Sequence, residues 1–133
     1  SVMKYRNTKQ KELILDIIKN NHDHPTIYEI YDEVKKADAS IGQATVYRNV
    51  KQFVKEGKIS LLKTKQGVDR YDFYQDHFHL ECLTCGKLLD FYDSKLLNQL
   101  KSKNYLDGFQ AANYNLTIEG YCLECNGGKR EEV

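Results

Sequence analysis

The chain has 133 residues, of which 41% are hydrophobic and 29% are charged, and it contains a single proline. This composition excludes a disordered or fibrous protein, and the length allows one domain or two small ones. The chain has neither an apolar run near the ~20 residues that span a bilayer nor the apolar start of a signal peptide, so we expect a cytoplasmic protein without a membrane partner.

The net charge of +1 conceals an asymmetry between the two halves of the chain. Residues 1–70 contain 14 Lys and Arg against 9 Asp and Glu, giving +5, whereas residues 71–133 contain 6 against 10, giving −4. A basic half joined to an acidic half suggests that the first half binds a polyanion. Solvated helix faces produce similar counts, so the charge alone does not decide the function.

Two helices are predicted near the start of the chain. Thr8 is expected to cap a helix that runs to about Lys19 and turns apolar residues to one side. These residues are Leu13, Ile14, Ile17 and Ile18. Thr26 and Glu29 have the spacing of a capping box, in which each side chain bonds the other residue's backbone N–H, and they predict the start of a second helix.

A third helix is predicted over residues 43–56, with Gly57 as its stop, and a hairpin follows it. Lys58–Thr64 and Val68–Tyr74 have extended periodicity and can pair around residues 65–67. Three short helices and a hairpin are typical of a winged helix-turn-helix, whose third helix enters the DNA major groove. The polar residues on the groove side would be Thr45, Tyr47, Arg48 and Lys51. An ordinary helical bundle with a solvated basic face fits the same pattern.

The second half of the chain predicts a small α/β domain. Strands are expected at Phe78–Cys82 and Lys87–Phe91, followed by a helix that Ser94 caps. Tyr114–Glu119 alternates apolar and polar residues, as a half-buried strand does. A unit of this size with so few large apolar groups needs a metal, a partner subunit, or both.

Two Cys-x-x-Cys pairs predict a structural zinc site. They are Cys82 with Cys85 and Cys122 with Cys125. Each pair places two sulfurs on one tight turn, and two such turns supply the tetrahedral four-sulfur shell that zinc prefers. Four thiolates leave no open position for water or substrate, so the zinc would be structural. Disulfides are the alternative, which a cytosolic chain disfavours.

A second group of possible ligands contains imidazoles and carboxylates without sulfur, a set that suits Fe(II), Mn(II) or Zn(II). Its members are His24, Asp72, His77, His79 and Asp90. His77 and His79 would share one face of a strand and therefore one ion. His24 lies in the presumed DNA-binding half, and a metal that it shared with the others would fix the angle between the domains. Each residue also has an ordinary structural role available, such as a satisfied core histidine.

An enzyme is the competing class of function. Two histidines and a carboxylate form the facial triad of non-haem iron oxygenases, which leave positions open for oxygen and substrate. The chain is short for an enclosed substrate pocket, and it shows no second cluster of acid, base or nucleophile. We therefore expect neither a small-molecule substrate nor catalysis.

Eight motifs follow one another along nearly the whole chain: Thr8–Lys11, His24–Thr26, Ala44–Arg48, Arg70–Phe73, His77–Cys82, Cys85–Lys87, Asp90–Phe91 and Gly120–Cys125. In type and order they resemble the ferric uptake regulator (Fur) family. The resemblance implies an α+β fold, with a winged helix-turn-helix DNA-binding domain at 1–74 and a small α/β metal-binding dimerisation domain at 75–133. It also implies a homodimeric repressor of double-stranded inverted-repeat operators.

Carried over position by position, the resemblance makes the four cysteines the ligands of the structural Zn²⁺. It makes the five histidines and aspartates above the ligands of a regulatory Fe²⁺ or Mn²⁺ between the domains. It also places Tyr47 and Arg48 on the recognition helix. Tyr114 stands near where some members have a further ligand histidine, so we expect no third metal site. Only seven residues precede Thr8, where many members carry an extra N-terminal helix, and this departure bears on how the protein binds DNA.

Aspartates at positions 72 and 90 resemble the peroxide-responsive (PerR) branch of the family. In that branch, bound Fe(II) reacts with hydrogen peroxide, a ligating histidine matching His24 or His77 is oxidised, and the repressor leaves DNA. Iron sensors usually carry glutamates at these two positions, and zinc sensors commonly place a cysteine at or near position 72. The alternatives are therefore a repressor of iron or manganese uptake, or of zinc uptake.

Overall fold

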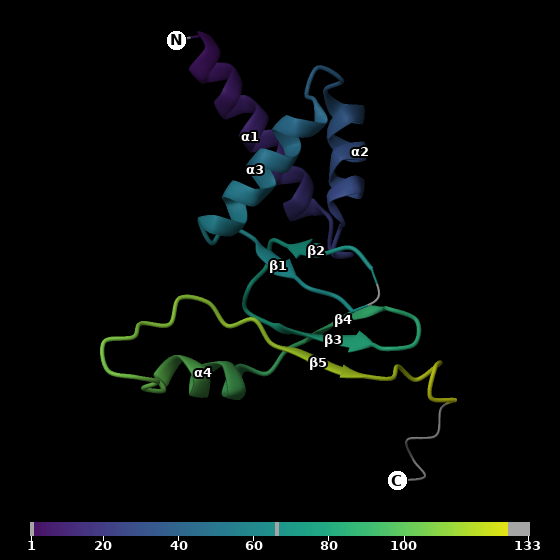
Figure 1. The fold of residues 1–133 in the computed structure, drawn as a ribbon, viewed down its shortest axis with the longest axis vertical. Coiled ribbons are helices and arrows are strands. Elements are labelled where there is room, and N and C mark those ends of the chain that lie inside the picture. The colour runs from purple at the N-terminus through teal and green to yellow at the C-terminus, as the bar shows by residue number, and fades with distance from the viewer. Residues whose placement is uncertain (1, 66, 128–133) are drawn as a thin grey trace. The chain divides into compact units, whose positions relative to one another are not determined.

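The computed structural model describes residues 2–65 and 67–127, which form four helices and five strands (Figure 1). They divide into two compact units, one of Ser1–Lys63 with Val68–Tyr74 and the other of Thr64–Gly67 with Gln75–Val133. The mixture of helices with two small sheets confirms the predicted α+β class. Within the described ranges, no helix is both long and apolar enough to cross a membrane.

The first unit contains three helices and a hairpin, the arrangement expected of a winged helix. Its elements are α1 (Val2–Asn20), α2 (Ile27–Ala37), α3 (Gln43–Lys55), β1 (Ser60–Leu62) and β2 (Arg70–Asp72). The apolar positions of the three helices meet in one core, whose members are Ile14, Ile18, Ile30, Val34, Ile41, Val46, Val50, Phe53 and Ile59. This core orients α3, because Val46, Val50 and Phe53 bury one side of the helix and leave Arg48 and Lys51 on the other.

The start of the first helix differs from the prediction. Thr8 does not cap α1, which begins at Val2, and its Oγ1 atom donates to the backbone oxygen of Lys4 at 3.0 Å. A threonine hydroxyl inside a helix commonly bonds the carbonyl four residues earlier. No glycine or proline interrupts residues 2–7, so the helix continues through them.

The capping box of the second helix is confirmed. Thr26 Oγ1 accepts from the backbone N–H of Glu29 at 3.2 Å, and Glu29 Oε1 accepts from the backbone N–H of Thr26 at 2.9 Å. Gly57 follows α3 with a φ of 74°, a left-handed conformation that costs glycine little, so the predicted stop is also confirmed.

The hairpin is shorter than predicted. β1 and β2 pair antiparallel with Ser60 opposite Asp72 and Leu62 opposite Arg70, so three residues of each predicted strand form the ladder. Beyond the ladder the segment is tied by side chains instead, as in the 3.3 Å ion pair of Lys63 Nζ with Asp69 Oδ2. Gln66 of the predicted turn lies outside the described residues.

The second unit has a three-stranded sheet and one helix: β3 (Phe78–Cys82), β4 (Leu88–Phe91), α4 (Ser94–Ser102) and β5 (Thr117–Gly120). The strand order is β4-β3-β5, with β3 antiparallel to β4 and parallel to β5. Because β4 is antiparallel to β3, it returns the chain to the end of the sheet at which β3 begins. β5 starts from that same end, and α4 lies on the connection that leads from β4 on one edge to β5 on the other (Figure 1).

Two details of this unit correct the sequence prediction. Asp93, not Ser94, caps α4, because its carboxylate accepts from the backbone N–H of Leu96 at 3.0 Å. The last strand begins at Thr117 rather than Tyr114. Leu116, just before it, and Ile118 within it are 37% and 48% exposed instead of half-buried. Their alternation gives the sheet an apolar face that the described residues of one chain leave open to solvent.

Candidate metal centres

The four cysteines come together at one edge of the sheet in the second unit. Cys82 ends β3, and Cys122 follows β5, so parallel pairing brings the two Cys-x-x-Cys turns to the same end. The four Sγ atoms all lie within 4.8 Å of one another, and those of Cys85 and Cys122 are 3.9 Å apart. Sulfurs bound to one tetrahedral zinc at ~2.3 Å lie roughly 3.8 Å from one another, so the donor set fits zinc.

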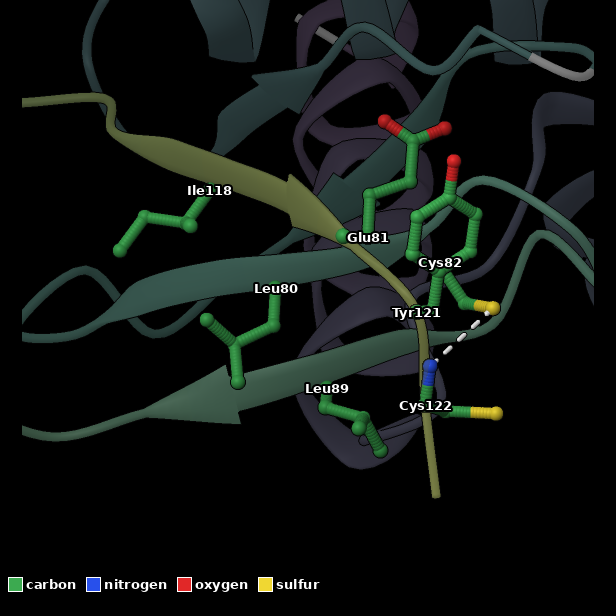
Figure 2. A pocket seen from close by; sticks show the side chains of 8 residues that line it. Leu80, Glu81, Cys82, Leu89, Ile118, Tyr121 and Cys122 are labelled. Atoms are coloured by element: carbon green, nitrogen blue, oxygen red, sulfur yellow. Dashed lines mark hydrogen bonds between the residues drawn. The ribbon is translucent and has the colours of Figure 1, made fainter. Parts of the chain in front are cut away.

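All four cysteines are free thiols, and their hydrogen bonds already favour a thiolate at one position. The backbone N–H of Cys122 donates to Cys82 Sγ at 3.4 Å (Figure 2). This bond, together with backbone hydrogen bonds from Cys85 and Thr84, lowers the pKa of the Cys82 thiol to about 6. A hydrogen bond with the Cys122 thiol raises the pKa of Cys125 to about 12. A metal ion that replaced these shared protons would take all four sulfurs as thiolates, the form that zinc binds.

An ion pair links the two cysteine turns on the outside. Lys87 Nζ lies 3.0 Å from Glu124 Oε1, and this hydrogen bond raises the pKa of Lys87. Neither residue was singled out from the sequence. Their pairing depends on the β3–β5 register that brings the two cysteine turns side by side. A pattern of neighbouring residues does not predict that register.

In the first unit, His24 and Asp72 form a buried pair. His24 Nε2 lies 3.5 Å from Asp72 Oδ2, and each residue is 6% exposed. The loop of His24 is held against β2 because Pro25 O accepts from the backbone N–H of Tyr71 at 2.9 Å. Arg70 Nη1 donates to His24 O at 3.0 Å. Arg70 is therefore a positioning residue for His24, a role that its place in the Arg70–Phe73 motif does not predict.

The backbone of His24 is itself unusual. Its φ of 56° is the one positive value at a non-glycine position in the described part of the chain. Residues with a Cβ seldom adopt this left-handed conformation, and holding it costs on the order of 1 kcal/mol or more. The hydrogen bonds from Arg70 to His24 O and from Tyr71 to Pro25 O help to offset that cost and hold the backbone from which the imidazole projects.

In the second unit, His77, His79 and Asp90 form another cluster. Asp90 lies opposite His79 in the β3–β4 ladder, and its Oδ1 atom is 3.1 Å from His77 Nε2 and 3.6 Å from His79 Nε2. The two imidazole rings are buried and their centroids are 4.8 Å apart, while the Asp90 side chain is 32% exposed. A carboxylate and two imidazoles directed at one point form a partial shell for a divalent metal.

The exposed side of α3 carries the residues predicted to face DNA. Arg48 and Lys51 are exposed, whereas Thr45 and Tyr47 are half-buried, and Tyr47 packs against the helical core. Gln43, the first residue of the helix, was not predicted as a candidate, and its Nε2 atom donates to Tyr47 Oη at 3.0 Å. The spacing of four residues is the available signal, since it places both side chains on one face of a helix.

A buried carboxylate in the second unit was also not predicted. Glu81 is 2% exposed, and its Oε2 atom accepts from the backbone N–H of Lys65 at 2.8 Å. The Lys65 ammonium lies 3.4 Å from Glu119 Oε2. Glu81 thus fixes the loop that follows β1, and it has no part in either cluster of metal donors.

Comparison with known proteins supplies independent evidence. The model of the family described as "Ferric uptake regulator family" matches residues 3–119. The chain is 33% identical over 122 residues to the peroxide operon regulator of Bacillus subtilis, covering 91% of this chain and 84% of that protein. The structure of the Campylobacter jejuni peroxide stress regulator matches with a TM-score of 0.76 at 29% identity, over 92% of this chain and 93% of that one.

A second solved structure, that of the Helicobacter pylori ferric uptake regulator, matches with a TM-score of 0.68 at 26% identity. It covers 89% of this chain and 80% of that one, and it is described as revealing three functional metal-binding sites. The match extends across both units of the fold, so the likeness is not confined to the helices.

Proposed function

The chain belongs to the ferric uptake regulator family, and on that basis we propose that it is a metal-dependent repressor of transcription that senses peroxide. Family membership makes it a metal-responsive transcriptional regulator and not an enzyme. The observation that carries the proposal furthest is the pair of sulfur-free donor clusters, His24 with Asp72 and His77 with His79 and Asp90.

Residues 1–74 form the DNA-binding domain in this proposal. α3 enters the major groove with Thr45, Tyr47, Arg48 and Lys51 on its DNA side, and the β1–β2 hairpin lies along the phosphates. The core contacts of α3 support this role, because they hold one side of the helix and leave a basic side exposed. Arginine and lysine suit guanine edges and phosphates, and the tyrosine ring suits thymine methyls.

Residues 75–133 form the metal-binding dimerisation domain. Apolar side chains on and beside the sheet are exposed in the single chain, and a second copy would cover them. They include Leu89, Leu106, Phe109, Leu116, Ile118 and Tyr121. A two-fold homodimer presents two α3 helices in opposite orientations, which is why the operator we propose is an inverted repeat.

Zn²⁺ in the four-cysteine site has a structural role in this proposal. It would join the end of β3 to the end of β5, which otherwise share a short ladder of four residue pairs. Since a unit with a small core gains much of its stability from such a staple, the zinc would keep the dimerisation domain folded.

The two sulfur-free clusters are the two halves of one regulatory site for Fe²⁺ or Mn²⁺ in our proposal, with His24, Asp72, His77, His79 and Asp90 as ligands. One half belongs to each unit, so an ion that needs both would favour the arrangement in which they meet. The ion can shift that equilibrium only by the difference between its affinities for the two arrangements. DNA affinity follows if the favoured arrangement is the one that fits the operator.

Peroxide sensing is the finer part of the proposal. The two carboxylate ligands are aspartates, and the curated relative from Bacillus subtilis is named a peroxide operon regulator. Fe(II) supplies the electrons that reduce hydrogen peroxide when it is bound at such a site. In this proposal the imidazole of His24 or of His77 takes up one oxygen atom of the peroxide, as the resemblance to the peroxide-responsive branch implies, and the other peroxide oxygen leaves as water. The loss of a ligand would then release the repressor from DNA.

A repressor of iron or manganese uptake is the alternative within the family. The same donor set suits both metals, and the Helicobacter pylori structure is that of a ferric uptake regulator. A zinc-uptake repressor is less well supported, because no cysteine belongs to the five-residue donor group.

DNA binding under anaerobic conditions tests the proposal. The protein is loaded with Fe(II) or with Mn(II), and its affinity for DNA upstream of its own gene is measured before and after a pulse of hydrogen peroxide. We expect both metals to activate binding and peroxide to abolish it for the iron form alone. If peroxide released neither the iron form nor the manganese form from DNA, the uptake repressor would be favoured. If DNA affinity were the same with and without metal, the regulatory site would be contradicted.

A further inference from the structure

Gln43 and Tyr47 form a fixed pair on the exposed side of α3. Gln43 Nε2 donates to Tyr47 Oη at 3.0 Å, one helical turn away. Tyr47 is half-buried and packs against the helical core, whereas Gln43 is exposed. The hydrogen bond therefore restricts the flexible side chain of Gln43 by joining it to the packed side chain of Tyr47. Gln43 then loses less conformational entropy when it binds a ligand.

The bond to Tyr47 leaves the recognition edge of the amide available. A glutamine amide has two N–H hydrogens and a carbonyl oxygen. The tyrosine oxygen needs only one of these hydrogens. With the hydrogen trans to the carbonyl oxygen given to Tyr47, the other hydrogen and the oxygen lie side by side in the amide plane. This donor and acceptor match the adenine edge in the major groove, where N7 accepts and the N6 amino group donates.

We propose that Gln43 recognises an adenine base in the operator and that Tyr47 positions its amide for that contact. The inference rests on the proposed role of α3 as the recognition helix. The first residues of such a helix lie nearest the base edges. Gln43 is the first residue of α3, and the residue before it, Gly42, has no side chain to cover it.

The neighbouring residues do not offer the same chemistry. Ala44 has no polar side chain, and the charged Arg48 and Lys51 suit phosphates and guanine. Gln52 is the other glutamine of the helix, but its Nε2 atom donates to the Glu56 carboxylate at 3.1 Å, near the C-terminal end. The negative charge of Glu56 opposes close approach to DNA.

The test is a selection of binding sequences from a library of random duplexes with the Mn(II)-loaded protein. We expect the wild-type consensus to contain an adenine in each half-site whose preference disappears in Gln43→Ala, while the other positions keep theirs. Loss of one bidentate base contact usually costs on the order of 10-fold, so the affinity of the dimer for a consensus with an adenine in both half-sites should fall on the order of 100-fold. Replacing that adenine by 7-deazaadenine removes N7, and should weaken the wild type but not Gln43→Ala.

Two further variants separate recognition from helix stability. Gln52→Ala removes an exposed glutamine with the same kind of bond from the same helix, and it should leave every base preference unchanged. Tyr47→Phe keeps the ring in its packing and removes the hydroxyl. It should weaken the same adenine preference, and it should add nothing to that position in the Gln43→Ala background.

Equal loss of affinity on all sequences in Gln43→Ala would overturn the inference, as would an adenine preference that survives the substitution. Either result would leave the proposed repressor function standing, because wild-type selection of a consensus would still be observed. Failure of the wild-type protein to enrich any duplex with Mn(II) would instead overturn both.

Discussion

His24 and Asp72 lie with imidazole Nε2 and carboxylate Oδ2 3.5 Å apart, one on the loop before α2 and the other at the end of β2. The loop is pinned by the backbone bond from Tyr71 to Pro25 and by Arg70. The left-handed backbone of His24 is thus held in place by two neighbouring residues, and the point from which its imidazole projects is set before any ligand binds.

His24→Ala should therefore weaken metal-activated DNA binding while the fold and the zinc content stay intact. The expected loss of activation is roughly 5- to 150-fold, the usual range of coupling between two sites. His22→Ala is the matched control, because His22 stacks on Tyr74 and is not among the grouped donors. The measurement is the affinity for operator DNA as a function of Mn(II) concentration. If His24→Ala showed the metal dependence of the wild type, His24 would not be a ligand of the proposed regulatory site.

Cys82→Ser and Cys122→Ser should each lose zinc, dimerisation and cooperative unfolding together, because binding energy at a structural zinc is folding energy. Thr84→Ser, inside the same Cys-x-x-Cys turn, should change none of them. Zinc per chain, sedimentation and thermal unfolding are the measurements. A Cys82→Ser protein that remained a dimer with the wild-type unfolding temperature would show that the site does not hold the domain together.

Asp90→Glu should keep activation by Fe(II) and Mn(II) but lose much of the sensitivity to peroxide. The charge is unchanged, while the extra methylene lets the carboxylate occupy the position that peroxide needs. Mass spectrometry of peptides containing His24 and His77, taken after peroxide treatment of the iron form, should show the gain of one oxygen in the wild type and little in the variant.

Asp76→Glu is the control for that experiment, because Asp76 is exposed and outside the donor groups. It should respond to peroxide like the wild type, and the manganese forms of all three proteins should resist it. Unmodified histidines in a wild-type iron protein that stays on DNA would shift the assignment to an iron or manganese sensor.

Thr26→Ala should lower the free energy of unfolding by about 1 kcal/mol, the usual cost of losing an N-cap. The hydroxyl of Thr26 accepts the Glu29 backbone N–H, which has no other partner at the first turn of α2. Thr8→Ala removes a hydroxyl from the interior of α1 and should be neutral or slightly stabilising. Chemical denaturation of the two variants checks this prediction. Equal decreases in the free energy of unfolding in Thr26→Ala and Thr8→Ala would contradict it.

Local patterns predicted the elements whose determinants are local. The capping box of Thr26 and Glu29 and the strand Phe78–Cys82 appear as expected, because each depends on neighbours within a few residues. The error at Ser94 is instructive, since Asp93 is an equally good cap and only side-chain geometry decides between them.

The candidate sites were predicted as sets of donors, but their supports were not. Arg70 positions His24, and Gln43 bonds Tyr47, through contacts that depend on a strand register or a side-chain rotamer. The exposed Leu116 and Ile118 were expected to be half-buried because alternation in a sequence shows which residues share a face. It does not show whether the cover for that face comes from the same chain.

The parallel pairing of β3 with β5 sets the order in which the second unit can assemble on the ribosome. Cys82 and Cys85 emerge at and just after the end of β3, but the parallel strand β5 and the other two cysteines follow only after α4 has been synthesised. A parallel pair cannot close through a tight turn, so this long-range contact forms late. During that interval the nascent chain carries two thiols without the other half of the proposed zinc shell. We therefore expect the yield of correctly folded protein to depend on reducing conditions until Cys122 and Cys125 have been synthesised.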